Sequence, residues 1–178
     1  ADFGSVGVEA MRVAWIGIKY ESIEFDVVKK FLETARNADS VRIQTMAILG
    51  LGIAIKHQNI GWSEVKKPLQ IARRSPSEKV AETAVRVVGV GLKEQIFQWD
   101  DVRQFIEVAQ QVEADSVTKM AVGAIGASLI KQTVEWNEIN ELLEYACQSG
   151  AESTKQEAIG VVGKAYLREI INWKTVEG

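Results

Sequence analysis

The sequence repeats with a period of 37 residues, and no insertion or deletion interrupts the register. Four of the five tryptophans fall in one column, which Phe25 precedes: Trp62, Trp99, Trp136 and Trp173. Glycines form a second column, which Trp15 precedes: Gly52, Gly89, Gly126 and Gly163. Alanines form a third: Ala10, Ala47, Ala84, Ala121 and Ala158. Self-similarity at a fixed period of this size predicts an array of stacked supersecondary units, none of which buries a core alone.

Each unit contains two helical patterns, of which the first is named helix A here. In the first tryptophan-led unit helix A covers about 62–74, with apolar residues three and four apart at Val65, Leu69 and Ala72. This spacing lines one face of an α-helix. A column of good N-cap residues falls at its start: Asp26, Ser63, Asp100 and Asn137. Acids follow at the next position, where the helix dipole favours negative charge.

The second pattern, helix B, covers about 76–95 and has Val80, Ala84, Val88 and Leu92 on one face. Two copies begin with a serine followed three residues later by a glutamate, which predicts capping boxes with serine at N-cap: Ser75-Pro76-Ser77-Glu78 and Ser149-Gly150-Ala151-Glu152. Pro76 then falls at the first helical position, where its missing N–H costs nothing.

The stretch Asp39-Ser40-Val41-Arg42, followed by Ala47 and by Leu49-Gly50, resembles the opening of HEAT repeats of the phycobilisome-lyase-like type. Degenerate versions begin at Glu78 and Asp115, and through the period the resemblance covers the whole chain. Armadillo-like helical arrays share much of this pattern.

The resemblance implies an all-α fold: a right-handed α-α superhelix, or α-solenoid, with A helices on the convex side and B helices lining the concave side. We expect one HEAT-like repeat domain over 1–178, with a leading B-type helix at 4–21. About four helix pairs follow, at about 25–58, 62–96, 99–133 and 136–170. Because the chain begins and stops in mid-unit, we also expect it to be a fragment of a longer protein.

Composition excludes several classes of protein. Hydrophobic residues make up 47% and charged residues 25%, which is too apolar for disorder. The net charge is -3, but cations outnumber acids by three in residues 1–89 and acids outnumber cations by six in residues 90–178. Such a bipolar layout bears on partner choice and on end-to-end contacts. The sequence has no apolar run of membrane-spanning length. A single cysteine allows no intrachain disulfide and fits a reducing compartment, so we expect a cytoplasmic protein.

The face of helix B opposite its core face is the candidate partner-binding surface, which the family geometry places in the concave groove. It is expected to be basic toward the N-terminus and small or apolar toward the C-terminus, through Arg12, Lys19, Arg42, Lys56, Arg86, Lys93, Lys119, Ile130 and Leu167. Such a surface suits a protein or peptide with an acidic segment and an apolar anchor. The alternative is a solvated face neutralised by nearby acids such as Glu9, Glu82 and Glu94.

Glycines inside helix B cost about 1 kcal/mol each relative to alanine, so something must offset them. Close helix-to-helix contact is the interpretation for the Gly52 column, whereas Gly123 and Gly160 are candidates for leaving room for a bound chain. The tryptophan column is interpreted as packing between units rather than as a platform for stacked bases. Pro68 lies inside helix A and is expected to bend it locally.

No catalytic or metal-binding constellation accompanies the repeat. His57 is the only histidine and is expected at the surface, and Cys147 shares a column with Arg36, Arg73 and Gln110 that is expected to be exposed. The sequence therefore predicts a protein-binding scaffold or regulatory module that is not an enzyme and holds no cofactor. Two alternatives stay open: a repair-related HEAT-like protein that binds nucleic acid, and an enzyme of the bilin-lyase type.

Overall fold

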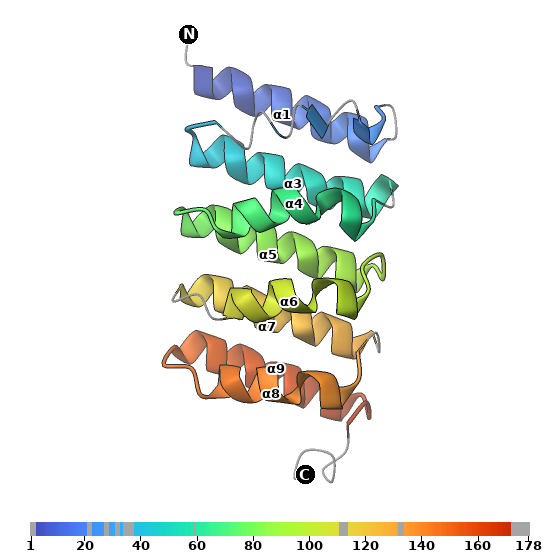
Figure 1. Ribbon diagram of the computed structural model, residues 1–178, viewed down its shortest axis with the longest axis vertical. Coiled ribbons are helices and arrows are strands. Elements are labelled where there is room, and N and C mark those ends of the chain that lie inside the picture. Colours follow the sequence, from blue (N-terminus) through green and yellow to red (C-terminus); the bar gives the residue numbers. More distant parts are fainter. Residues whose placement is uncertain are drawn as a thin grey trace.

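The computed structural model describes residues 3–20, 23–26, 29–30, 33, 38–58, 60–110, 114–131 and 134–171. All regular structure in these residues is helical, as the sequence predicts. The labelled helices are α1 (Phe3–Lys19), α3 (Val41–Gln58), α4 (Trp62–Arg73), α5 (Glu78–Lys93), α6 (Trp99–Gln110), α7 (Asp115–Ile130), α8 (Trp136–Cys147) and α9 (Glu152–Leu167). Figure 1 shows them stacked in chain order, with the N-terminal helix at one end and α9 at the other.

The helices form two layers. The first, here called the B layer, contains α1, α3, α5, α7 and α9, and each of these helices packs against the next. The second, the A layer, contains α4, α6 and α8, and each packs against the B helix that follows it in the chain. Both expected helix types are therefore present, and among the described residues they alternate from α3 to α9. The A helix expected to open the 25–58 pair lies largely outside the described residues.

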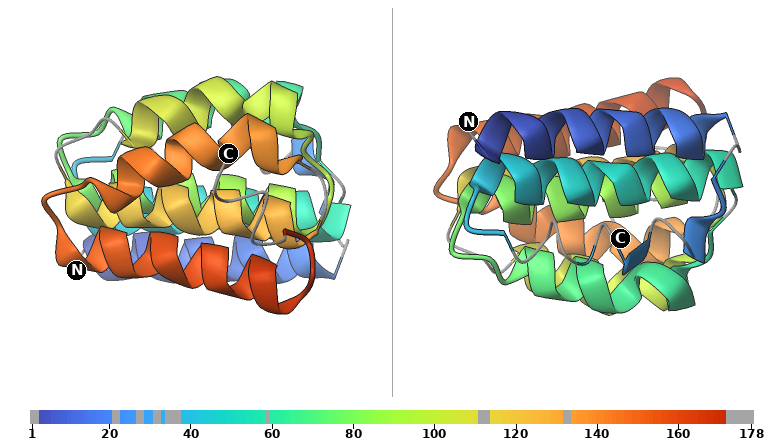
Figure 2. Two further views of the ribbon diagram at one scale, coloured as in Figure 1. Left: turned by 90° about the horizontal axis from the view of Figure 1, so that it is seen from below. Right: turned by 90° about the horizontal axis from the view of Figure 1, so that it is seen from above.

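The B layer is curved. Viewed along the stack in Figure 2, α1 and α9 lie further from the A layer than α5 and α7 do. The outer side of the B layer is therefore the inner side of this curve. The handedness of a superhelix and the family membership remain predictions.

The core lies between the layers and runs the length of the stack. In the A layer, Val65 and Leu69 are fully buried, and Trp62 and Trp99 are buried as well. The Trp62 ring meets Phe97 and Phe105 edge to face, with centroids 5.4 and 5.7 Å apart. The packing role predicted for this column is thus confirmed at Trp62 and Trp99. Trp136 is only half-buried because it lies at the last described unit, and Trp173 lies outside the described residues.

Glycines allow neighbouring B helices to approach closely. A Cβ placed on Gly52 would lie 3.2 Å from Val87 Cγ2, and one on Gly89 would lie 3.4 Å from Ala124 Cβ. A Cβ placed on Gly126 would lie 3.4 Å from Val161 Cβ, and both γ-methyl groups of Val161 would be nearer still. Close packing is therefore confirmed at Gly52, Gly89 and Gly126, which lie between helices, but not at Gly163, which is exposed and has no described atom within 4 Å of the added Cβ. Gly160 also has open space where a side chain would be.

The helix starts differ from the predicted capping boxes. Helix α5 begins at Glu78 with Ser77 at N-cap, two residues after the predicted Ser75, and α9 begins at Glu152 with Ala151 at N-cap. The hydroxyl of Ser75 instead accepts the N–H of Ser77, and that of Ser149 accepts the N–H of Ala151. Each serine therefore closes a turn two residues ahead of the N-cap and does not cap the helix. Pro76 lies in that turn, outside the helix.

The A helices begin one residue earlier than their predicted caps. Because α4 and α8 start at the tryptophans, Ser63 and Asn137 lie within the first turn. The N-cap residues are Gly61 and Glu135, whose backbone N–H groups donate to Glu64 Oε2 at 3.0 Å and to Glu138 Oε2 at 2.7 Å. The acids predicted to complement the helix dipole thus also satisfy an N-cap donor.

Candidate interaction surface

The nine residues predicted to bind a partner all lie on the B layer. Seven are exposed: Arg12 and Lys19 on α1, Arg42 and Lys56 on α3, Arg86 and Lys93 on α5, and Leu167 on α9. Lys119 and Ile130 on α7 are partly exposed. Adjacent B helices place such side chains about 10 Å apart, which is the usual spacing of packed helices. The predicted residues are therefore accessible or partly accessible side chains on consecutive B helices.

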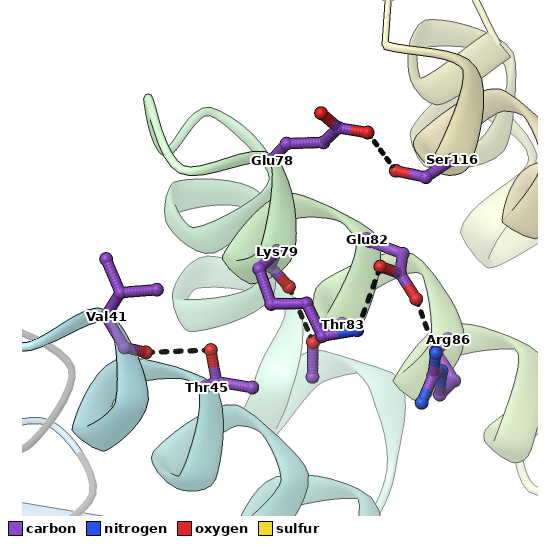
Figure 3. Close-up of polar contacts among 8 residues, drawn as sticks. All are labelled: Val41, Thr45, Glu78, Lys79, Glu82, Thr83, Arg86 and Ser116. Atoms are coloured by element: carbon purple, nitrogen blue, oxygen red, sulfur yellow. Dashed lines mark hydrogen bonds and ion pairs between the residues drawn. The ribbon is translucent and has the colours of Figure 1, made fainter.

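Acidic side chains neutralise part of the basic end of this row. Arg12 pairs with Glu9 at 2.8 Å on α1, and Lys56 lies 3.8 Å from Glu94 across the α3–α5 contact. Figure 3 shows Lys79 and Arg86 both directed at the carboxylate of Glu82 on α5. Exposed pairs of this kind contribute roughly 0–1 kcal/mol each, but they lower the net positive potential. Glu9, Glu82 and Glu94, the acids that the alternative of a solvated face predicts as neighbours, thus form these ion pairs.

The N-terminal ends of the B helices are joined by a hydroxyl–carboxylate ladder. Ser116 on α7 donates to Glu78 on α5, as Figure 3 shows. One unit later Ser153 donates to Asp115 at 2.6 Å, and Thr154 donates to the other oxygen of the same carboxylate. The Ser153 and Thr154 hydroxyls hold the pKa of Asp115 below its ordinary value. This edge of the B layer is therefore fixed by internal hydrogen bonds.

A hollow opens on the outer side of the B layer, between α5, α7 and α9. Its volume is about 250 Å³, and its lining consists of Lys93, Gly123, Gly126, Ala127, Ile130, Lys131, Glu157, Val161 and Lys164. Lysines 93, 131 and 164 surround a floor of small and aliphatic residues, and the one acid in the lining is Glu157. Two of the predicted residues, Lys93 and Ile130, thus meet in one place. Gly123 lines the same hollow, as expected of a glycine that leaves room for a bound chain.

Sequence reasoning missed three of the charged residues in the lining, Lys131, Glu157 and Lys164. Lys131 follows Lys93 by 38 residues, the separation at which Lys56 meets Glu94 and Glu78 meets Ser116. A search for residues one repeat plus one apart would therefore have found Lys131. Lys164 and Glu157 come from the next B helix and required the curvature of the layer to be known.

The A layer has its own inter-unit contact, through the column that ends at Cys147. Arg73 is only 7% exposed and donates to the Phe105 carbonyl at 2.9 Å while its guanidinium lies 4.7 Å from the Phe105 ring centroid. Burial, and after it the neighbouring charge of Arg74, lowers the pKa of Arg73. One unit later Gln110, also buried, donates to the Leu142 carbonyl at 3.1 Å.

The expected exposure of this whole column is therefore wrong for Arg73 and Gln110, because each reaches the next A helix. Cys147 is exposed as predicted, but for another reason: no described helix follows it in the A layer. Arg36, the first member of the column, lies outside the described residues.

No group of three or more His, Cys, Asp or Glu side chains among the described residues is arranged to hold a metal ion. His57 is half-buried near the end of α3, so its predicted surface position holds only in part. None of the helices that the structure describes is both long and apolar enough to cross a bilayer.

In comparisons with known proteins, no protein-family model and no curated protein matches the chain.

Proposed function

We propose that this chain is a protein-binding scaffold or regulatory module, built as a right-handed HEAT-like α-solenoid, that holds an extended partner segment on the outer side of its B layer. The partner class that fits best is an acidic peptide segment carrying one aliphatic anchor. The observation that supports the proposal most directly is the hollow between α5, α7 and α9, where lysines surround an aliphatic floor.

The charge and shape of the hollow favour this ligand class. Lys93 and Lys131 are exposed and Ile130 is half-exposed, so both cationic and apolar contacts are accessible from solvent. Carboxylates on the partner would gain charge-assisted hydrogen bonds from the lysines, while a leucine-sized side chain would contact Ile130 and Val161. The basic residues nearer the N-terminus contribute less, because Arg12, Lys56 and Arg86 already have acidic neighbours.

Fluorescence anisotropy tests the proposal with a labelled peptide that carries four glutamates around a central leucine. The variant Lys93→Glu/Lys164→Glu reverses two charges of the hollow and is expected to weaken binding by at least about 10-fold, since like charges then oppose the peptide. The matched control is Lys66→Glu/Lys67→Glu, which changes two exposed lysines of α4 in the A layer and should leave binding within about 2-fold. Equal losses in both variants would indicate non-specific charge attraction and contradict the proposal.

Replacing the peptide with a single-stranded oligonucleotide in the same assay distinguishes a nucleic-acid partner from a peptide partner. Phosphate-driven binding falls steeply and log-linearly with salt and does not depend on the leucine anchor. If the oligonucleotide bound more tightly than the peptide and the hollow variant abolished that binding, the partner class would be nucleic acid and the peptide proposal would be wrong.

A further inference from the structure

A second hollow opens in the A layer, away from the lysine-lined hollow of the B layer. It lies between α4 and α6, which are neighbours in the stack (Figure 1), and its volume is about 400 Å³. Arg73 and Arg74 line it together with the neutral polar side chains of Gln70, Ser75 and Gln104. None of the described residues in its lining is acidic. The hollow is therefore a cationic site with neutral hydrogen-bonding groups around it.

The guanidinium of Arg73 is buried and fixed, yet only partly hydrogen-bonded. It lies over the Phe105 ring and donates one N–H to the Phe105 carbonyl. Its other N–H donors have no acceptor among the residues that the structure describes. None of these donors is sealed inside the protein, so they are open to the hollow that Arg73 lines. Because a largely buried donor without a partner is costly, an acceptor that entered the hollow would be bound favourably.

The positive charge of the hollow is not neutralised by the described part of the chain. Burial, and after it the charge of Arg74, lowers the pKa of Arg73, so the two cations are close enough to repel each other. The ion pairs among the described residues all involve other cations. Two neighbouring cations without a counter-charge attract a dianion more strongly than a monoanion.

Contact between the helices does not explain the charge of Arg73. One unit later Gln110 makes the equivalent bond, to the Leu142 carbonyl at 3.1 Å, with a neutral amide. A cation in the same buried position adds a desolvation cost that this contact does not require. The negative end of the α4 dipole favours cations and accounts for the exposed Arg74, but it does not account for a cation as buried as Arg73.

The rest of the site also differs from its counterpart in the next unit. Four lining positions become more negative one repeat later: Arg73 and Gln110, Arg74 and Gln111, Gln70 and Glu107, Gln104 and Glu141. The place between α6 and α8 thus carries acids where the place between α4 and α6 carries cations and neutral amides. Because all four differences act in the same direction, the hollow between α4 and α6 is specialised for an anion.

We propose that this hollow binds a phosphate monoester, either free or carried by a phosphorylated residue of another protein. The guanidinium groups of Arg73 and Arg74 match the charge of the dianion and can each donate two parallel N–H bonds to its oxygens. The amides of Gln70 and Gln104 and the hydroxyl of Ser75 can donate to the oxygens that remain. A carboxylate, with one charge and two oxygens, would use less of this donor set. The proposal is independent of the lysine-lined hollow.

Isothermal titration calorimetry with inorganic phosphate, at constant ionic strength, tests the site. The unmodified chain is expected to bind phosphate. Arg74→Gln removes an exposed charge and should weaken binding by at least about 10-fold, because a charge-assisted hydrogen bond is lost. Arg73→Gln should weaken it as much, although glutamine can keep the bond to the Phe105 carbonyl as Gln110 does to Leu142. A purely structural role for Arg73 predicts no such loss.

The matched control is Arg42→Gln/Arg86→Gln, which removes two exposed arginines of the B layer. It should leave phosphate binding within about 2-fold of the unmodified chain. Equal losses in the control and in the hollow variants would indicate general charge attraction and overturn the proposal. The same holds if both hollow variants keep the unmodified affinity, or if the unmodified chain binds no phosphate up to about 10 mM.

Thermal unfolding separates binding from folding. A ligand that binds only the native protein raises its Tm, so phosphate should raise the Tm of the unmodified chain. Because phosphate also stabilises proteins in general, the rise is compared with that of the Arg42→Gln/Arg86→Gln control. Arg74→Gln should keep the Tm that the unmodified chain has without phosphate, and should lose the part of the rise that exceeds general stabilisation. A full rise in Arg74→Gln would contradict the site.

Peptide probes then identify the source of the phosphate. The first peptide carries one phosphoserine between neutral residues, and the second carries glutamate in its place. If the phosphopeptide binds at least about 10-fold more tightly than inorganic phosphate, the ligand is a phosphorylated protein segment. Equal affinities would assign the site to free phosphate esters. If the glutamate peptide binds as tightly as the phosphopeptide, the site does not select phosphate and the proposal is wrong.

Discussion

At the scale of single residues, the segment after α5 folds back on the helix it has just left. The backbone N–H groups of Ile96 and Phe97 both donate to the Gly91 carbonyl, at 2.9 and 3.1 Å, after Gln95 adopts a φ of 59°. This is the left-handed C-terminal arrangement that satisfies the last carbonyls of a helix. It brings the Phe97 ring onto Gly91, where an added Cβ would lie 2.7 Å from the ring Cγ.

Gly91→Ala is therefore expected to destabilise the protein by about 1–3 kcal/mol, because a buried ring attached to the backbone cannot move away from the new methyl group. Urea unfolding followed by circular dichroism measures the change. One unit earlier in the same pattern, Ala54 is followed by Ile60, and both are buried. The double variant Gly91→Ala/Phe97→Ile copies that pair and should recover much of the loss. An equal loss in both variants would mean that the ring is not the obstacle.

At the scale of helices, the A layer is joined by side chains that donate to a backbone carbonyl of the next helix. Arg73 connects α4 to α6 in this way, and Gln110 connects α6 to α8. Since Arg73 also covers the Phe105 ring, Arg73→Ala should lower the free energy of unfolding by about 1.5–3 kcal/mol. Arg74→Ala removes the same charge from an exposed neighbour and should change stability by less than about 0.5 kcal/mol.

Thermal and urea unfolding of the two arginine variants distinguish a specific bond from a general charge effect. Arg73→Gln is an informative third variant, because glutamine makes the equivalent bond at Gln110. The Arg73→Gln variant should therefore keep part of the free energy of unfolding that the Arg73→Ala variant loses. If Arg73→Ala and Arg74→Ala were equally mild, the buried bond would contribute nothing measurable.

At the scale of the whole molecule, stability should be highest in the middle of the stack. Helix α5 packs against both α3 and α7, whereas α1 and α9 each pack against one neighbour in the B layer. In an array of nearest-neighbour contacts the ends open before the centre. Hydrogen exchange at low micromolar concentration should therefore be faster in α1 and α9 than in α5, by on the order of 100-fold. Uniform protection along the stack would show that the molecule unfolds as one cooperative unit.

The sequence predicts the helical fold and its order well, because periodic burial leaves a strong pattern. The A helix expected at 62–74 is observed at Trp62–Arg73, and the leading helix expected at 4–21 is observed at Phe3–Lys19. Helix B, expected at about 76–95, is shorter at both ends, at Glu78–Lys93. A serine two residues before the N-cap resembles a cap in sequence, but its hydroxyl accepts the N–H of the N-cap residue itself when the preceding turn is tight.

The candidate surface is less predictable, because it depends on neighbours from other units. The residues of the exposed row were found from helical spacing alone, but their ion pairs with Glu94 and Glu82 depend on rotamers and on the distance between helices. The column of Arg73 looked solvent-facing because its members are polar. A polar residue is buried at low cost when a carbonyl of the next helix accepts its hydrogen, and no pattern within one helix records that.

The glycine contacts between B helices have a mechanical consequence. Where Gly52 meets Val87 and Gly89 meets Ala124, a glycine on one helix faces a small or β-branched side chain on the next, so the two helices approach closely. Such contacts resist separation of the two helices but oppose a change in their crossing angle only weakly. Small changes of this angle at successive contacts therefore add up along the B layer. The curved B layer can then widen or tighten as a whole, with only a small change of energy at each contact between helices.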